Sequence, residues 1–252
     1  MSRKSTYKQV LSIGTAVVLV ILLAACIAVD AALPSYHIAI TVIKKATVYS
    51  LVAVSMNLLN GFTGLFSLGQ AGFMLLGAYT YAILTIPTAD REAVYYLYNG
   101  SAVKFSLPEI FASFLGDKVG SAVGMILALL VGGLIAAFFA YLIGLPVLRL
   151  KSDYLAIATL GFAEIIRAFF QWQKLGRVTN GANMLKSFPT FADFNIKNAS
   201  GEVVLRLSTF VPFLLAILSI AVIVLLIHSS YGRAFKAIRD DEVAAEAMGI
   251  NL

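Results

Sequence analysis

Residues 119–148 read VGSAVGMILALLVGGLIAAFFAYLIGLPVL, a run of 30 residues that contains no Asp, Glu, Lys or Arg. A helix that crosses the hydrocarbon core of a bilayer needs about 20 mostly apolar residues. The run is long enough to meet that need. It therefore predicts a transmembrane helix over residues 120–145.

Other stretches of the chain have the same character. The uncharged run 46–89 is long enough for two helices, and the run 154–173 is interrupted only by Glu164 and Arg167. The predicted spans, in chain order, are 10–29, 42–61, 67–87, 120–145, 154–173 and 208–228. The sequence thus predicts an all-α, polytopic integral membrane bundle of about six transmembrane helices, organised as one domain over residues 1–252.

The composition supports a membrane protein. Hydrophobic residues make up 60% of the 252 residues and charged residues 13%, whereas a soluble domain has about 25% charged residues. The net charge of +6 comes from basic residues between apolar runs, which favours a membrane topology signal over nucleic-acid binding. The single cysteine, Cys26, excludes an intrachain disulfide. The sequence shows no nucleophile–base pair and no metal-ligand cluster that would indicate an enzyme, and no cofactor is predicted.

Basic residues near span ends predict the orientation, because they favour the cytoplasmic side. They are Arg3, Lys4, Lys8, Arg149, Lys151, Arg233, Lys236 and Arg239. The N-terminus is therefore expected in the cytoplasm, with loops 88–119 and 174–207 outside. Within the first predicted span, Leu23-Ala24-Ala25-Cys26 follows basic residues and an apolar run, which also resembles a lipoprotein signal. An uncleaved helix is favoured because the apolar run continues to Val29.

Small residues recur at every fourth position of the fourth predicted span. They are Gly120, Gly124, Ala128, Gly132, Ala136, Ala140 and Gly144. Small side chains allow a second helix to approach closely. Ordinary packing within one bundle is the favoured interpretation, with Gly120, Gly124 and Gly132 as packing residues, and a helix of a translocation core is the alternative.

Two polar features are candidates for a translocation pathway. A run of Gly, Ser, Thr, Asn and Gln interrupts the apolar sequence between Asn60 and Gly77, with Gln70 as its best polar candidate. A plain turn and a broken helix lining a pathway are both open interpretations. Glu164 and Arg167 lie within the fifth predicted span, where charges mark functional sites, although a stabilising i,i+3 ion pair is also compatible.

The segment 231–249 predicts two short cytoplasmic helices joined by a polar bend. Asp240 or Asp241 is a suitable N-cap for the second helix, and Gly249 is a suitable stop. The segment resembles the coupling loop of ABC importer permeases, whose pattern is Glu-Ala-Ala, three residues, Gly. Here Val243-Ala244-Ala245 is followed by Glu246-Ala247-Met248 and Gly249, so that valine replaces the first glutamate and Glu242 lies beside it.

Three longer matches make the resemblance more specific. They are TGLFSLGQAGF at 63–73, KSDYLAIATLGF at 151–162 continuing to Glu164-Ile165-Ile166-Arg167, and AIRDDE with AMGI within 237–250. The chain resembles branched-chain amino acid permeases of the LivH/LivM type, and the charged fifth span favours a LivM-like member. Family members usually continue with further spans, so a truncated gene product, a fragment and an incomplete sequence are all open interpretations of this chain.

The resemblance implies a subunit of an ATP-driven importer in the bacterial inner membrane. Its partners would be a second, LivH-like permease subunit, two cytoplasmic ATPases, an extracytoplasmic amino-acid-binding protein and membrane lipid, but no nucleic acid. ATP would be bound by the partners, since the chain has no phosphate-binding Gly-x-x-x-x-Gly-Lys loop. The implied coupling residues are Arg239, Asp240, Glu242, Ala244, Ala245 and Gly249. Leucine, isoleucine and valine are the implied substrates. The alternatives are an ABC permease for urea or short amides and an ion-coupled secondary carrier.

Overall fold

A computed structural model describes residues 38–150, 152–197 and 203–250, together with Val17, Ile21, Ala24 and Ala28. The rest of the predicted span 10–29, including Cys26, lies outside the described residues. The chain forms two compact units, Met1–Leu58 with Thr190–Leu252, and Leu59–Pro189. Helices dominate both units, which confirms the predicted all-α membrane bundle. A single domain over residues 1–252 stays a prediction.

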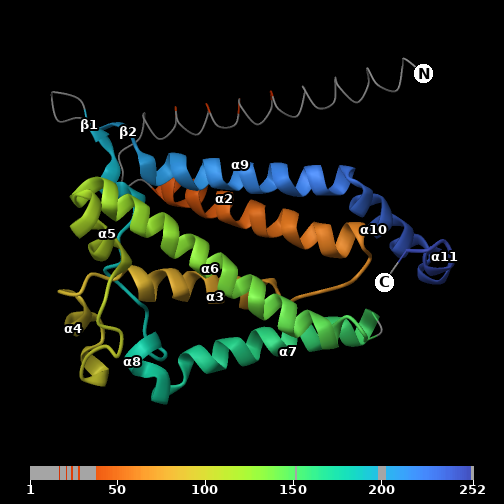
Figure 1. Ribbon diagram of the computed structural model, residues 1–252, viewed down its shortest axis with the longest axis horizontal. Helices are drawn as coiled ribbons and strands as arrows, with labels where there is room; N and C mark the ends of the chain where they lie inside the picture. Colours follow the sequence, from red (N-terminus) through yellow and green to blue (C-terminus); the bar gives the residue numbers. More distant parts are fainter. Residues whose placement is uncertain are drawn as a thin grey trace. The chain divides into compact units, whose positions relative to one another are not determined.

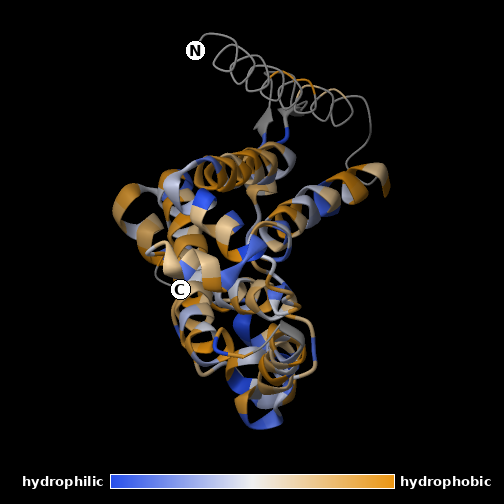
Figure 2. Cartoon of the chain, turned by 90° about the vertical axis from the view of Figure 1, so that its right-hand side faces the viewer, coloured by the Kyte–Doolittle hydropathy of each residue, from blue (hydrophilic) through white to orange (hydrophobic). Residues whose placement is uncertain are grey.

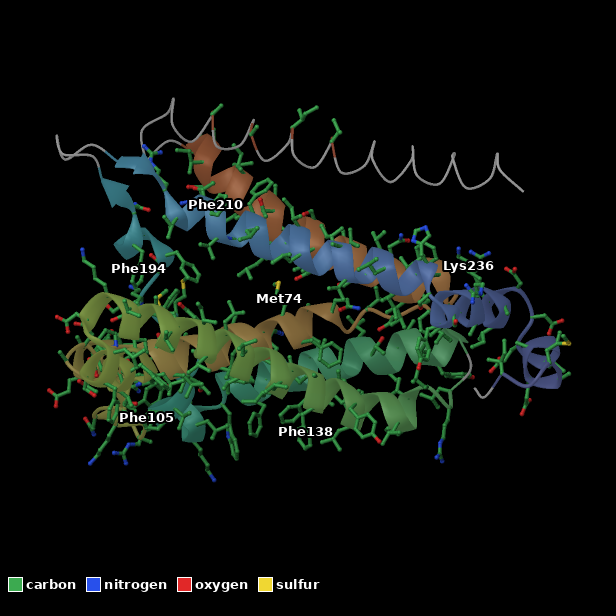
Figure 3. All side chains as sticks on the ribbon, turned by 45° about the horizontal axis from the view of Figure 1, so that its top comes forward. Met74, Phe105, Phe138, Phe194, Phe210 and Lys236 are labelled. Atoms are coloured by element: carbon green, nitrogen blue, oxygen red, sulfur yellow. The ribbon has the colours of Figure 1, made fainter. Side chains whose placement is uncertain are left out.

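The first unit is built on two long helices that lie side by side, α2 (Ile38–Asn57) and α9 (Leu207–His228) (Figure 1). The ammonium group of Lys44 on α2 donates a hydrogen bond of 2.9 Å to the hydroxyl of Ser208 on α9. The short helix η4 (Phe191–Phe194) also packs on α9, and Figure 3 labels Phe194 and Phe210 on these two elements.

Two further parts of the first unit flank α9 in sequence. Before α9, the strands β1 (Ile196–Lys197) and β2 (Val203–Leu205) form an antiparallel pair, in which Ile196 is opposite Leu205. After α9, the chain bends at Ser229 and continues into α10 (Ser230–Asp240) and α11 (Glu242–Ala247). The strands are too short to change the fold class.

The second unit contains the other long helices. The π-helical turn η1 (Leu58–Phe62) continues α2, and a non-helical segment then leads into α3 (Gln70–Thr85). The helices α5 (Leu107–Leu115) and α6 (Asp117–Val147) pack on each other, and α3 contacts both α6 and α7 (Ser152–Gln171). The short helices of this unit are α4 (Arg91–Val94), η2 (Tyr96–Tyr98), η3 (Gln173–Leu175) and α8 (Gly176–Thr179).

Four helices of the described part of the chain are long and apolar enough to cross a membrane: Ile38–Phe62, Asp117–Val147, Tyr154–Gln171 and Leu207–His228. They match four of the predicted spans, and α3 with its 16 residues lies within a fifth. Figure 2 shows that the helices carry many hydrophobic residues. Large apolar side chains are exposed on them, such as Phe138 and Leu225, which are 58% and 72% exposed. A protein with this surface is a multi-pass membrane protein, because lipid can solvate such side chains and water cannot.

Candidate functional site

The polar run after Asn60 forms a non-helical segment, residues 63–69, between η1 and α3. Its backbone groups are bound by side chains. The amide oxygen of Asn60 accepts a hydrogen bond of 3.1 Å from the backbone N–H of Ser67, and the hydroxyl of Thr159 on α7 accepts one of 3.0 Å from the N–H of Leu68. Gly64 adopts a φ of +74°, which favours glycine. The segment is thus an ordered break.

The break lies at the depth of the membrane-spanning helices. Thr159 is five residues beyond the start of the span Tyr154–Gln171, which at about 1.5 Å per residue places it about 7–8 Å inside the span. A Cβ added to Gly72 would lie 2.9 Å from the Cα of Ala163, so that α3 and α7 touch just after the break. Non-helical backbone at membrane depth is tolerated only where protein or a water-filled cavity surrounds it. This geometry favours the broken-helix interpretation over a plain turn.

Gln70 is the first residue of α3. Gln70 and Gly72 are two residues apart on the helix, so their side-chain directions differ by about 160°. Because Gly72 faces α7, Gln70 points away from α7. The structure therefore does not bring Gln70 together with the charged pair on α7.

Glu164 and Arg167 form an ion pair on α7. Both Nε and Nη2 of Arg167 bind the same oxygen, Oε2 of Glu164, at 2.8 Å and 2.7 Å. The side chains are 57% and 56% exposed, so within this chain the pair lies on the surface of α7. Glu164 is seven residues from the end of α7, about 10 Å along the helix axis, and lies near the middle of the span Tyr154–Gln171.

The three predicted packing glycines lie at close backbone contacts of α6. A Cβ at Gly120 would be 2.2 Å from the carbonyl oxygen of Phe111, and one at Gly124 would be 2.5 Å from the Cα of Pro108. At Gly132 the nearest atom would be the carbonyl oxygen of Gly77 on α3, at 3.0 Å. The glycine stripe thus holds α6 against α5 and α3 within the second unit.

The predicted coupling segment forms α10 and α11. The carboxylate of Asp241 caps α11 by accepting a hydrogen bond of 3.0 Å from the N–H of Ala244. Gly249 has a φ of +84°. The N–H of Gly249 donates to the carbonyl of Glu246 at 2.9 Å, and that of Ile250 to Ala245 at 3.1 Å. This is the Schellman termination of a helix, so capping is the structural role of Asp241 and Gly249.

The predicted coupling residues differ in exposure. Ala245 is only 4% exposed, whereas Val243 and Met248 are 77% and 84% exposed. Arg239, Asp240, Glu242 and Ala244 are exposed as well, and Arg239 pairs with Asp240 at 2.8 Å. Lys236, labelled in Figure 3, adds a further exposed cation on α10. Ala245 therefore lies inside the α10–α11 hairpin, and other side chains form its surface.

The loops of the second unit are organised by a buried arginine, Arg91. Its role was missed by the sequence analysis. We call residues 86–106 and 172–189 the loop cap. The guanidinium of Arg91, which is 3% exposed, donates hydrogen bonds to the hydroxyl of Ser101 and to the carbonyls of Ile83, Val103 and Phe105. Four partners for one side chain fold the first loop around Arg91. Its sequence signal is weak, because any loop arginine is usually exposed.

Tyrosines join the two halves of the loop cap. The hydroxyl of the fully buried Tyr95 donates a hydrogen bond of 2.8 Å to the carbonyl of Val178. The ring of Tyr98 lies against Gly176, where an added Cβ would be 2.0 Å from the ring. Burial raises the pKa of Tyr95 and lowers that of Arg91, because removal from water disfavours a charged form.

The described residues contain no group of three or more His, Cys, Asp and Glu that could hold a metal ion. Residues 38–252 match the family model described as "Branched-chain amino acid transport system / permease component". The chain belongs to this family of permeases. The family is a class of transport proteins and not of enzymes, and the predicted resemblance to LivM-like permeases is confirmed.

Two curated relatives carry the name "High-affinity branched-chain amino acid transport system permease protein LivM". The one from Escherichia coli (strain K12) is 31% identical over 224 residues, and the one from Salmonella typhimurium (strain LT2) is 30% identical over 224 residues. Each alignment covers 81% of this permease but only 44% of the relative. This permease thus spans less than half the length of the relatives it matches. No solved structure matches it significantly.

Proposed function

We propose that the chain is a membrane subunit of an ATP-driven importer for leucine, isoleucine and valine. The observation that carries this proposal is the family match over residues 38–252. The relatives named LivM, at about 30% identity, support the same substrates. The subunit lies in the bacterial inner membrane with its N-terminus in the cytoplasm.

The partners of this importer are a second permease subunit, two cytoplasmic ATPases and an extracytoplasmic amino-acid-binding protein. ATP is bound by the ATPases. The α10–α11 hairpin is the docking surface for one ATPase. Its exposed Val243 and Met248 stand beside the acidic Glu242 and Glu246, so an apolar groove with a basic rim would complement it. Ala245 and Gly249 act indirectly, by holding the shape of the hairpin.

The translocation pathway runs along the second unit. The ordered break at residues 63–69, Gln70, and the Glu164–Arg167 pair are its candidate residues. The pair supports this proposal because two exposed charges on a membrane-spanning helix are costly against lipid. The face of α7 that carries them is therefore in contact with water or protein.

The transport proposal is tested by uptake of radiolabelled leucine in cells that lack this gene, with the gene restored at its natural length. We expect restored uptake that valine and isoleucine inhibit. Urea and acetamide serve as competitors for the alternative substrates. Uptake that neither depends on the gene nor responds to these competitors would contradict the proposal.

The docking surface is tested by two matched substitutions. Met248→Glu places a charge on the hairpin, and Met184→Glu places the same charge at a methionine of the loop cap that is 79% exposed. We expect Met248→Glu to reduce co-purification of the ATPase about tenfold or more, as loss of an apolar anchor does at other interfaces. Met184→Glu should leave it unchanged. Equal recovery of ATPase with both variants would refute the assignment of this surface.

A further inference from the structure

The Glu164–Arg167 pair keeps free hydrogen-bonding capacity. Both bonds of the pair use Oε2 of Glu164, together with Nε and Nη2 of Arg167. Within the described part of the chain, Oε1 of Glu164 and Nη1 of Arg167 have no hydrogen bond. The pair therefore presents one unused acceptor and one unused donor, side by side.

The neighbouring residues leave the pair open. Gly161 and Ala168 lie about one helical turn from Glu164 on either side and are small and exposed. A Cβ added to Gly161 would meet no atom within 4 Å. Nothing on α7 itself therefore covers the carboxylate, and a molecule of a few atoms can approach it.

Apolar side chains surround this polar spot along α7. Leu160, Ile165 and Phe169 are 48%, 62% and 55% exposed. A ligand that suits this surface carries a positive and a negative group close together and an apolar remainder. A zwitterionic α-amino acid with an aliphatic side chain has this chemistry.

We infer that Glu164 and Arg167 form a subsite on the translocation pathway that binds the α-ammonium and α-carboxylate groups of the transported amino acid. Oε1 of Glu164 accepts from the ammonium group, and Nη1 of Arg167 donates to the carboxylate. The ion pair stays intact, so that binding needs no separation of charges at membrane depth. This inference rests on the proposed transport function and adds to it the residues that recognise the amino acid backbone.

The test uses the assembled transporter, with its ATPases and loaded binding protein, in phospholipid vesicles. Uptake of radiolabelled leucine and ATP hydrolysis are measured together. In the variant Glu164→Gln/Arg167→Gln, which removes both charges and keeps both side chains polar, we expect uptake to fall about tenfold or more, as when charge-assisted hydrogen bonds are lost. ATP hydrolysis stimulated by the binding protein should remain. The control Glu92→Gln/Arg177→Gln, at exposed positions of the loop cap, should change neither.

A charge-swapped variant separates recognition from stabilisation. Glu164→Arg/Arg167→Glu restores an ion pair but reverses the positions of its charges. If the pair only stabilises the bundle, the swap restores uptake, which would overturn the inference. If the pair binds a zwitterion in one orientation, uptake stays low while the ATPases still co-purify.

Other outcomes are equally decisive. A wild-type complex that takes up no leucine refutes the proposed function itself. Normal uptake by the neutral variant, or failure of that variant to assemble, refutes only the subsite. The headgroup of phosphatidylethanolamine is also a zwitterion. A defect confined to vesicles that contain this lipid would identify a lipid site and overturn the inference.

Discussion

Gly124 on α6 is the position where one added methyl group should test the packing of the second unit most directly. A Cβ at Gly124 would lie 2.5 Å from Cα of Pro108, 2.6 Å from its N and 2.8 Å from the carbonyl carbon of Leu107. All three are backbone atoms of α5, so no side-chain rotation relieves the clash. Restoring the 3.4 Å of ordinary van der Waals contact to Pro108 requires a shift of about 0.9 Å.

The connection between the helices limits this shift. Only Gly116 separates α5 from α6, so α5 cannot slide away freely. Overpacking costs about 1–3 kcal/mol, and three backbone contacts place Gly124→Ala near the upper end. Alanine also favours a helix over glycine by about 1 kcal/mol. The net loss of unfolding free energy is therefore about 1–2 kcal/mol.

Gly133→Ala is the matched control. Gly133 lies in the same helix, and an added Cβ there meets no atom within 4 Å. Both substitutions gain the same helix preference, so the difference between them isolates the steric cost, about 2–3 kcal/mol. The assay is unfolding of the full chain in mild detergent by added sodium dodecyl sulfate. The fluorescence of Trp172, the single tryptophan, reports on the same unit.

Equal unfolding free energies for Gly124→Ala and Gly133→Ala would refute the reasoning. That result would mean that α5 and α6 are not in backbone contact at this point. A larger loss for Gly133→Ala would contradict the assignment of which face of α6 is packed.

Three further predictions concern the loop cap and the predicted coupling segment. Arg91→Leu leaves the carbonyls of Ile83, Val103 and Phe105 without their donor and should lower the unfolding free energy by about 3 kcal/mol. This loss is measured as faster hydrogen exchange over residues 86–106. The control Arg177→Leu, at an exposed position, should leave the exchange unchanged. Burial raises the pKa of Tyr95 above its usual 10.0, so the unfolded chain loses this proton at a lower pH than the folded chain does. The stability of the loop cap should therefore be constant below about pH 10 and fall above it. Tyr95→Phe should remove this fall, and an identical pH profile in the variant would contradict the assignment. Gly249→Ala should lower the stability of the α11 terminus by about 1 kcal/mol because φ at this position is +84°. Gly249→Asn should lower it less because asparagine tolerates this conformation. Faster amide exchange at Ile250 in the alanine variant alone would support both statements.

The spans could be read from the sequence because each is a local property. A membrane-crossing helix must satisfy its backbone hydrogen bonds internally and be apolar along about 20 residues, and the run at 119–148 meets both conditions by itself. The caps of α11 are equally local: Asp241 and Gly249 act on groups within a few residues of themselves. Such features need no knowledge of distant contacts.

The break before α3 shows where sequence reasoning stopped. Gly64 and Asn60 predicted an interruption, but a turn and a broken helix have similar residues. The choice depends on Thr159, 91 residues away from Leu68, whose hydroxyl accepts the Leu68 N–H. The charged pair is a similar case. Its i,i+3 spacing predicted the contact, but the exposure of both side chains depends on which face of α7 packs against α3.

The sequence by itself determined that this chain is a membrane-embedded helical permease, because hydrophobic length and short motifs are encoded residue by residue. The tertiary structure alone decided that Ala245 is buried, that Arg91 is the centre of the loop cap, and that the ion pair on α7 lies open. These properties arise from contacts between segments far apart in the chain. Their free energies depend on burial and distance, which no local pattern specifies.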